Sequence, residues 1–426
     1  MAVYDRWHVK KPRGPAETCK EHSRGDTVLY KSAEHGKGDR WQVRWRDLHD
    51  KQCSENRPLK EGRNPAIHAE ARDKEIQGQL LSGGYVDPSA GKVTLLAYAR
   101  DWLTAQTADP STLDRLDRWY RLRLDGSAIA AMEMAALARR PTVIQQWVKG
   151  LTGQGLSASS VGQALGTLSS VFGAALDDGI IARNPCRSKT VRPPKPAERK
   201  IVPLTFEQCR DLRAGLPGRY RAMADCGFRA GLRGSETLGL GPAEIGPDLA
   251  VVRQVKYAGG RLYFAPPKGG KIRTVPLDDA TVLLLTEHLE TFGAVEVALP
   301  WGAPDGRPVA VPLLFPMLGG QGGPARAMRR AESSRLWIAA RRSAGVPVTA
   351  ETGWHLLRHT AASAWLAGGS DIMQVAEWLG HSDPRTTWEY YAHLRPDREQ
   401  IGRQAMAAFC TPLEDKIQKG SARHVP

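Results

Sequence analysis

Near its carboxyl end the chain has the sequence Leu379-Gly380-His381-Ser-Asp-Pro-Arg-Thr-Thr-Trp-Glu-Tyr390-Tyr391-Ala-His393-Leu394. Asp383 followed by Pro384 is typical of a helix start, because an N-cap carboxylate accepts a backbone hydrogen bond and proline suits the first helical position. The stretch therefore predicts a helix that begins shortly after a histidine and carries two adjacent tyrosines.

Three further patterns precede this stretch. They are Ala230-Gly-Leu-Arg233-Gly-Ser-Glu236, then Pro267-Lys268-Gly-Gly-Lys271-Ile-Arg273-Thr-Val-Pro276, then His355-Leu-Leu-Arg358-His359-Thr360. His355 and Arg358 would share one helix face, because residues three apart are neighbours on a helix surface. Lys268 would stand on a tight turn, since the two glycines that follow it permit positive φ.

Together these residue types suit the cleavage of a phosphodiester bond without a metal. The transition state gathers negative charge on the non-bridging oxygens, and the arginine fork matches phosphate geometry while it stays protonated. A nucleophile must attack in line, and the leaving sugar oxygen needs a proton. The four patterns supply arginines, histidines, a lysine and tyrosines, which is a complete set for this chemistry.

Each element alone has a simpler interpretation. Arg233 and Glu236 could form a surface ion pair, and Lys268 could be a solvated turn residue. His355 and His359 are four apart and could bind zinc, but no acidic or cysteine partners are nearby, so no metal site is expected. One of the two tyrosines could be a packing residue. The ordered set, and no single member, indicates the function.

The order of these motifs resembles the catalytic domain of the tyrosine recombinases, the family of phage lambda integrase and the Xer recombinases, over about residues 201–400. The preceding helical block resembles the family's core-binding domain, and the basic aromatic start resembles its arm-type domain. The resemblance implies a site-specific DNA recombinase that cleaves and rejoins strands through a 3′-phosphotyrosyl intermediate. Such an integrase would insert or excise a phage or mobile element without ATP, metal or other cofactors.

By position, the resemblance implies that Arg233 and Arg358 clamp the scissile phosphate and that His381 donates a further hydrogen bond to it. Lys268 would protonate the leaving 5′ oxygen, and His355 would assist the proton transfer. These roles follow from the family's pattern and not from the spacing alone.

The resemblance also implies that Tyr391 is the nucleophile and that Glu236 orients the site from behind. Tyr390 lies nine residues after His381 and Tyr391 lies ten, and both spacings look admissible. The family's tyrosine usually precedes a small residue and a histidine, as Tyr391 does and Tyr390 does not. Tyr391 is therefore preferred.

Charge and composition agree with a nucleic-acid partner. The 426 residues include 60 Lys and Arg against 45 Asp and Glu, a net charge of +15, which favours a polyanion, although a merely basic enzyme would also fit. No segment has the apolar length to span a bilayer and the start lacks a signal-peptide core, so a cytoplasmic, nucleoid-associated protein is expected. The cysteines lack paired spacing and are expected to be isolated thiols without zinc or disulfides: Cys19, Cys53, Cys186, Cys209, Cys226 and Cys410.

The expected fold class is mainly α with small β-sheets (α+β), in several domains. The expected segments are an arm-type DNA-binding domain of β-sheet plus helix at 1–85, a helical core-binding domain at 92–186, a basic Pro-rich linker at 187–200, a catalytic domain at 201–410, and a flexible basic tail at 411–426. The catalytic domain is expected to contain a three-stranded antiparallel sheet from 250–255, 261–264 and 272–277.

Two basic stretches are candidates for contact with DNA. Residues 40–46 alternate apolar with polar side chains, which predicts a half-buried strand with Arg40, Arg44 and Arg46 opposite the tryptophans. That strand could press arginines onto DNA or be a solvated edge. The extended linker could lie along phosphates or be a plain spacer; its candidate residues are Lys189, Arg192, Lys195, Arg199 and Lys200.

The expected partner is double-stranded DNA at attachment sites, bound by a homo-tetramer, with an accessory DNA-bending or directionality factor possible and no membrane. A type IB topoisomerase is one alternative, but the separate basic start and helical block suit a recombinase better. A non-catalytic DNA-binding protein that kept the fold is the other, and the intact catalytic set argues against it.

Overall fold

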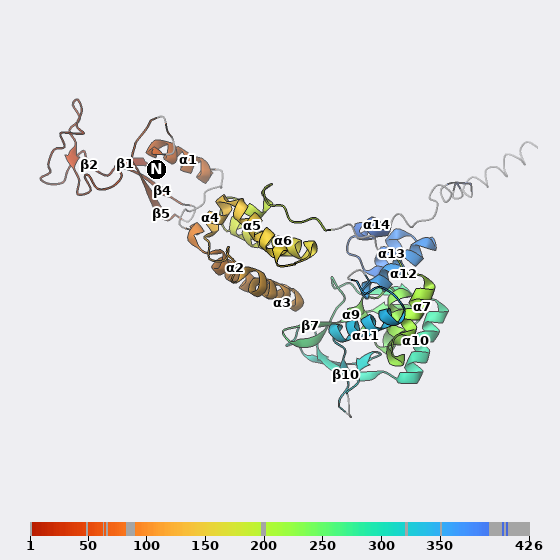
Figure 1. Ribbon diagram of the computed structural model, residues 1–426. Coiled ribbons are helices and arrows are strands. Elements are labelled where there is room, and N and C mark those ends of the chain that lie inside the picture. Colours follow the sequence, from red (N-terminus) through yellow and green to blue (C-terminus); the bar gives the residue numbers. More distant parts are fainter. Residues whose placement is uncertain are drawn as a thin grey trace, which may run out of the picture. The chain divides into compact units, whose positions relative to one another are not determined.

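The computed structural model describes residues 2–47, 50–62, 64, 67–81, 90–196, 202–319, 323–349, 352–391, 403, 406 and 407. The chain divides into two compact units (Figure 1). The first unit comprises residues 1–107 and 115–197, and the second comprises 108–114 and 198–426. None of the helices in the described part of the chain is long and apolar enough to cross a membrane.

The amino-terminal part of the first unit is a small antiparallel sheet with one helix packed on it. The sheet has the order β1 (Ala2–Asp5), β4 (Trp41–Arg46), β5 (Gln52–Arg57), and helix α1 (Ala69–Leu81) packs on β1 and β4. Strand β2 (His8–Val9) pairs separately with β3 (Tyr30–Lys31).

Strand β4 has the predicted alternation of buried and exposed side chains. Val43 and Trp45 are buried against Ala69 and Ile76 of α1, while the arginines of β4 point to solvent. Because β4 lies between β1 and β5, the interpretation of this stretch as an edge strand is wrong.

The helical part of the first unit holds its own apolar core. Its helices are α2 (Leu95–Thr104), the part of α3 (Pro110–Trp119) from residue 115 on, α4 (Met134–Arg139), α5 (Pro141–Gly153) and α6 (Ala158–Asp177), and a π-helical turn covers Tyr120–Leu124. Thr94 caps α2, its side chain accepting a hydrogen bond from Ala97 N at 3.3 Å. Helix α3 starts at Pro110, where the Asp109 carboxylate accepts a hydrogen bond from the backbone of Ser111 at 3.0 Å.

The start of the expected linker is docked on this helical core. Val191 is buried in the core, and the Gln145 side chain accepts a hydrogen bond from Arg192 N at 2.6 Å. Lys189, Arg192 and Lys195 are exposed, whereas the candidates Arg199 and Lys200 lie outside the described residues.

The second unit combines helices with short strand pairs. Its helices are α7 (Phe206–Ala214), α8 (Arg221–Phe228), α9 (Gly234–Thr237), α10 (Asp279–Phe292), α11 (Arg330–Ser343), α12 (His355–Ala367), α13 (Ile372–Leu379) and α14 (Pro384–Tyr391). Its strands are β6 (Asp248–Val251), β7 (Gln254–Ala258), β8 (Arg261–Ala265), β9 (Arg273–Pro276), β10 (Val295–Pro300), β11 (Pro308–Leu313), β12 (Pro316–Met317) and β13 (Arg326–Ala327). The mixture of helices with small antiparallel sheets agrees with the predicted fold class.

The strand pairing in the second unit differs from the prediction. In place of one three-stranded sheet, β6 pairs with β9 and β7 pairs with β8. The predicted strand 250–255 is split at Arg253, because its guanidinium turns inward to Gly239 O at 2.8 Å and to Glu244 at 2.6 Å. The Gly- and Pro-rich stretch 301–324 contains β11, which pairs with β10, and β12.

Candidate active site

Arg233 lies where α8 gives way to α9. Gly231 has φ +62°, and a Cβ there would come within 2.9 Å of the Trp365 ring, so this bend requires glycine. The chain then turns at Arg233, which occupies the N-cap position of α9. Glu236 follows in the first turn of α9 and accepts a hydrogen bond from Arg233 N at 2.9 Å.

Glu236 is a buried carboxylate shared by two arginines. Arg233 Nη1 donates to Glu236 Oε1 at 2.8 Å, and Arg273 on β9 donates to both carboxylate oxygens at 3.0 and 2.7 Å. Burial alone would raise the pKa of Glu236, but the hydrogen bonds and charge of Arg273 and the charge of Arg233 hold it at about 2. The alternative of a surface ion pair is therefore wrong, since Glu236 is only 2% exposed.

The end of α13 docks onto the same two arginines. Arg233 Nη2 donates to Gly380 O at 3.1 Å, and Arg273 Nε donates to Trp378 O at 2.7 Å. Gly380 has φ +64°, and a Cβ there would lie 3.0 Å from Arg273 Cδ. The glycine of the Leu-Gly-His motif is thus explained by the close approach of this backbone to Arg273.

Arg358 is a buried cation held by uncharged groups. It is 2% exposed, and its guanidinium donates to Gly231 O at 2.7 Å and to Leu379 O. Within the described ranges, no carboxylate forms an ion pair with it. Burial and the positive charge of Arg233 lower its pKa. A buried guanidinium without an acidic partner is a favourable site for an anion.

Three histidines surround Arg233 and Arg358. Helix α12 begins with His355, which is solvent-exposed, and the His355 and His359 rings lie 5.3 Å apart. His381 Nδ1 is 2.7 Å from the hydroxyl oxygen of Thr387, which orients the ring. Burial and the charges of Arg358 and Arg233 lower the pKa of His381 to about 4, so the ring is neutral at pH 7.

Tyr391 is the last residue of α14 and packs into the α12–α14 core. It is 4% exposed, and its hydroxyl is hydrogen-bonded to His359 Nδ1. Burial, with the charges of His355 and Arg358, lowers the pKa of His359 to about 4, so a neutral ring meets the phenol. The side chain of Tyr390 lies outside what the structure describes.

Lys268 makes no hydrogen bond or ion pair to this cluster in the part of the chain that the structure describes. It is exposed on the turn between β8 and β9, where Gly269 and Gly270 both have positive φ as predicted. Among the described contacts, none joins Lys268 to the arginines or histidines. The structure therefore brings together the other predicted residues, which are Arg233, Glu236, His355, Arg358, His381 and Tyr391.

Two residues of this cluster were not predicted from the sequence. Arg273 holds Glu236 and the end of α13, and its only sequence signal was its place inside the Lys268–Pro276 motif. His359 contacts the tyrosine hydroxyl, and its signal was its position directly after Arg358, where it was considered only as a metal ligand.

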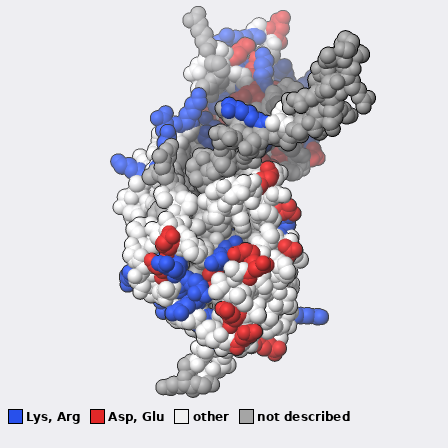
Figure 2. Space-filling view, turned by 90° about the vertical axis from the view of Figure 1, so that its right-hand side faces the viewer, with Lys and Arg blue, Asp and Glu red and all other residues white. Residues whose placement is uncertain are grey.

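The predicted arginines of the amino-terminal sheet differ in their surroundings. Arg40 is held by Asp5 at 2.7 Å and lies over the Trp41 ring, so it is a structural residue. Arg44 lies over the Tyr4 ring, and both Arg44 and Arg46 are exposed. Basic and acidic side chains are intermingled on the face of the molecule drawn in Figure 2, without one continuous basic surface.

Comparison with known proteins identifies the family. The model of the phage integrase family matches residues 204–398. Tyrosine recombinase XerC 1 of Ralstonia nicotianae is 30% identical over 345 residues, which cover 76% of this chain and 93% of that protein. A XerC-like tyrosine recombinase of Caldanaerobacter subterraneus is 27% identical over 352 residues, with 78% and 86% covered.

A solved structure shares the fold. The integrase of transposon Tn1549, residues 82–397, in complex with a circular intermediate DNA, superimposes with a TM-score of 0.61 at 19% identity, covering 73% of this chain and 99% of that one. The chain belongs to the tyrosine recombinase family and is a site-specific DNA recombinase.

Proposed function

We propose that the arginine–histidine cluster around Glu236 binds the scissile phosphate of a DNA duplex and that Tyr391 attacks it. The observation that carries the proposal is Arg358, a buried cation whose recorded partners are backbone carbonyls. A phosphate between Arg358 and Arg233 would supply the negative charge that Arg358 lacks. Glu236 accepts a hydrogen bond from Arg233 Nη1 and Gly380 O accepts one from Nη2, which fixes the guanidinium while it keeps further N–H groups for the ligand.

Strand cleavage would then proceed by in-line displacement. The Tyr391 oxygen forms a bond to phosphorus, the bond from phosphorus to the 5′ oxygen breaks, and a 3′-phosphotyrosyl ester results. His359 is hydrogen-bonded to the phenol and is therefore placed to take the phenolic proton. Lys268 is assigned to protonate the leaving 5′ oxygen with help from His355, and its turn would have to approach the phosphate when DNA binds.

Rejoining reverses these steps. A 5′ hydroxyl attacks the phosphotyrosyl ester, the bond to Tyr391 breaks, and the phenol regains its proton. The ester conserves the energy of the phosphodiester, so no external energy source is needed. Since Tyr391 is 4% exposed in this conformation, α14 must shift when the duplex is bound.

The rest of the chain would hold the duplex. In this proposal residues 1–85 form an arm-type module that contacts DNA through Arg44 and Arg46, and residues 92–186 form a core-binding domain. The linker 187–200 follows the phosphates with its exposed basic residues, and the catalytic domain covers 201–410, followed by the tail. That the Tn1549 integrase was solved with DNA supports a duplex as the partner. A tetramer would join two attachment sites of a mobile element, with an accessory factor where the DNA must bend.

Covalent trapping on nicked DNA tests this proposal. Duplexes tiled across the DNA that flanks the gene are nicked near the cleavage position, so that the short 5′-hydroxyl fragment diffuses away. Wild type should accumulate a protein–DNA adduct on a few sequences, and Arg358→Ala should form at least about 100-fold less, the usual scale for a lost transition-state donor. An equal adduct yield from Arg358→Ala would refute the phosphate site.

The products separate a recombinase from a type IB topoisomerase. Two duplexes that carry the trapped sequence should exchange strands through a Holliday junction. Relaxation of supercoiled plasmid without any joined product would favour the topoisomerase instead.

A further inference from the structure

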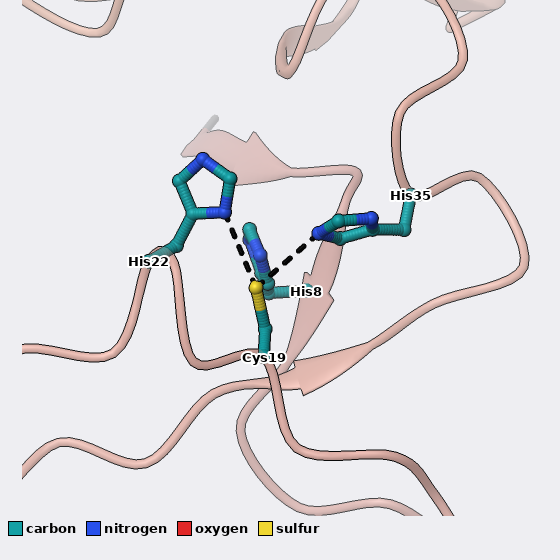
Figure 3. A group of neighbouring side chains, drawn as sticks. All are labelled: His8, Cys19, His22 and His35. Atoms are coloured by element: carbon teal, nitrogen blue, oxygen red, sulfur yellow. Dashed lines mark hydrogen bonds between the residues drawn. The ribbon is translucent and has the colours of Figure 1, made fainter.

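Four potential metal ligands meet in the amino-terminal part of the chain. His8 on β2, Cys19, His22 and His35 converge from separate segments (Figure 3), and one ligand atom of each lies within 4.8 Å of all the others. Cys19 Sγ is 3.2 Å from His22 Nδ1 and 3.3 Å from His35 Nε2. Cys19 is a free thiol, as predicted, but two imidazoles lie beside it, which was not predicted.

His8 is oriented as a metal-binding histidine usually is. Its Nδ1 lies 3.0 Å from Asp5 Oδ2, and Asp5 is itself held by Arg40 at 3.0 and 2.7 Å. Its other ring nitrogen, Nε2, is buried and has no hydrogen-bond partner in the part of the chain that the structure describes. A carboxylate behind one nitrogen fixes the ring, so that the second nitrogen can bind a metal.

The segment around these ligands has almost no apolar core of its own. Between residues 10 and 38, Cys19 is the one buried side chain, and the regular structure is limited to the pairing of β2 with β3. A stretch of this length needs some other link to hold a defined shape, and metal ions commonly supply it in small modules. Backbone bonds shape the turn at the cysteine, because Cys19 N donates to Leu29 O at 2.7 Å and Ser23 N donates to Cys19 O at 3.2 Å.

We propose that His8, Cys19, His22 and His35 bind one zinc ion with tetrahedral geometry. One thiolate and three imidazoles are ligands that zinc prefers, and the two short Sγ–N distances are close to the roughly 3.6 Å edge of a tetrahedral site. Closing the widest pair, now up to 4.8 Å apart, takes side-chain movements of about 1 Å. Four protein ligands leave no open position, so the ion is structural.

The ion links two parts of the amino-terminal module. Asp5 ends β1, and Arg40 precedes β4, so the Asp5–His8 contact ties the metal site to the sheet that carries Arg44 and Arg46. Zinc would thereby fix the 10–38 segment against this sheet. The inference stands on these contacts and does not depend on the proposed phosphate chemistry.

Metal analysis of the full chain tests the proposal. Protein purified without chelators should contain about one zinc ion per chain. The zinc content of Cys19→Ser and of His22→Ala should each be lower by at least about tenfold. Cys53→Ser is the matched control, since Cys53 is a thiol of the same module outside the cluster, and it should keep its zinc. Wild type without zinc, or Cys19→Ser with a full complement, overturns the proposal.

Binding of Co²⁺ to the wild-type chain is a second test, and its result does not depend on whether a variant folds. Wild type stripped of metal and given Co²⁺ should show the absorption of tetrahedral cobalt together with a thiolate-to-cobalt charge-transfer band. Cysteine alkylation before the addition of Co²⁺ should abolish that band, and bound metal should protect Cys19 but not Cys53 from alkylation. A cobalt spectrum without a thiolate band places the metal elsewhere and refutes the site.

Discussion

Glu236→Gln removes the negative charge that Arg233 and Arg273 share. Four hydrogen bonds reach this carboxylate, and its pKa of about 2 instead of 4.5 corresponds to about 3 kcal/mol of stabilisation. Breaking a buried ion pair by removing one partner costs about 3–5 kcal/mol, an independent figure of the same size. The variant should therefore destabilise the second unit by about 3 kcal/mol.

Hydrogen exchange during urea unfolding is the suitable assay, because peptides from α8, α9 and the end of α13 report on the second unit alone. Glu377→Gln on the exposed face of α13 is the control and should change the free energy of unfolding by less than about 0.5 kcal/mol. In wild type, this contribution should be complete above pH 4.5 and decline as the pH falls toward 2, because the folded-state pKa is the lower one. If Glu236→Gln lowers the free energy of unfolding of the second unit by less than about 1 kcal/mol, the carboxylate does not contribute the stability stated here.

Three further outcomes are expected. Gly380→Ala should lower the unfolding free energy by about 1–3 kcal/mol in thermal melts, because φ is +64° and the new Cβ would meet Arg273; an unchanged melt would contradict this. The double variant Arg44→Ala, Arg46→Ala should weaken the binding of every DNA sequence. Titrations at several salt concentrations should show that the slope of log affinity against log salt concentration falls in magnitude by about 2. An unaltered slope would remove these arginines from the interface. The rate of adduct formation should be flat from pH 6 to 8 and fall as the pH approaches 4, where His359 becomes protonated and can no longer accept the phenolic proton; a fall already near pH 6.5 would contradict the lowered pKa.

The local structure around the candidate site residues could be predicted because each of the elements that carry them is short. The Arg233–Glu236 turn, the His355–Arg358 helix start and the His381 turn all depend on neighbouring residues, which the sequence displays directly. That these segments come together in the fold was expected only from the resemblance to the tyrosine recombinases. The physical cause is the buried Glu236 carboxylate, which binds both Arg233 and Arg273.

Long-range partners could not be predicted in the same way. The pairing of β6 with β9 joins segments more than 20 residues apart, and nothing in the alternation of either strand specifies its partner. In the sequence, Arg273 cannot be distinguished from an exposed strand arginine. Its ion pair with Glu236 becomes visible only in the folded structure. The prediction of one three-stranded sheet was wrong because the sequence of a strand does not specify which strand it pairs with.

The histidine–cysteine cluster escaped prediction because its ligands are widely spaced. Only Cys19 and His22 are near neighbours in the sequence, and no second cysteine stands at a spacing typical of a metal site. His8 and His35 join them through the pairing of β2 with β3 and the turns around it, which no periodic pattern foretells.

Tyr391 is the residue proposed to form the covalent bond to DNA. After covalent trapping, nuclease and protease digestion should leave a nucleotide on the peptide that contains Tyr390 and Tyr391, and fragmentation should assign it to Tyr391. Tyr390→Phe should still form the adduct, while Tyr391→Phe should form none. An adduct formed by Tyr391→Phe, or a nucleotide carried by Tyr390, would contradict the account.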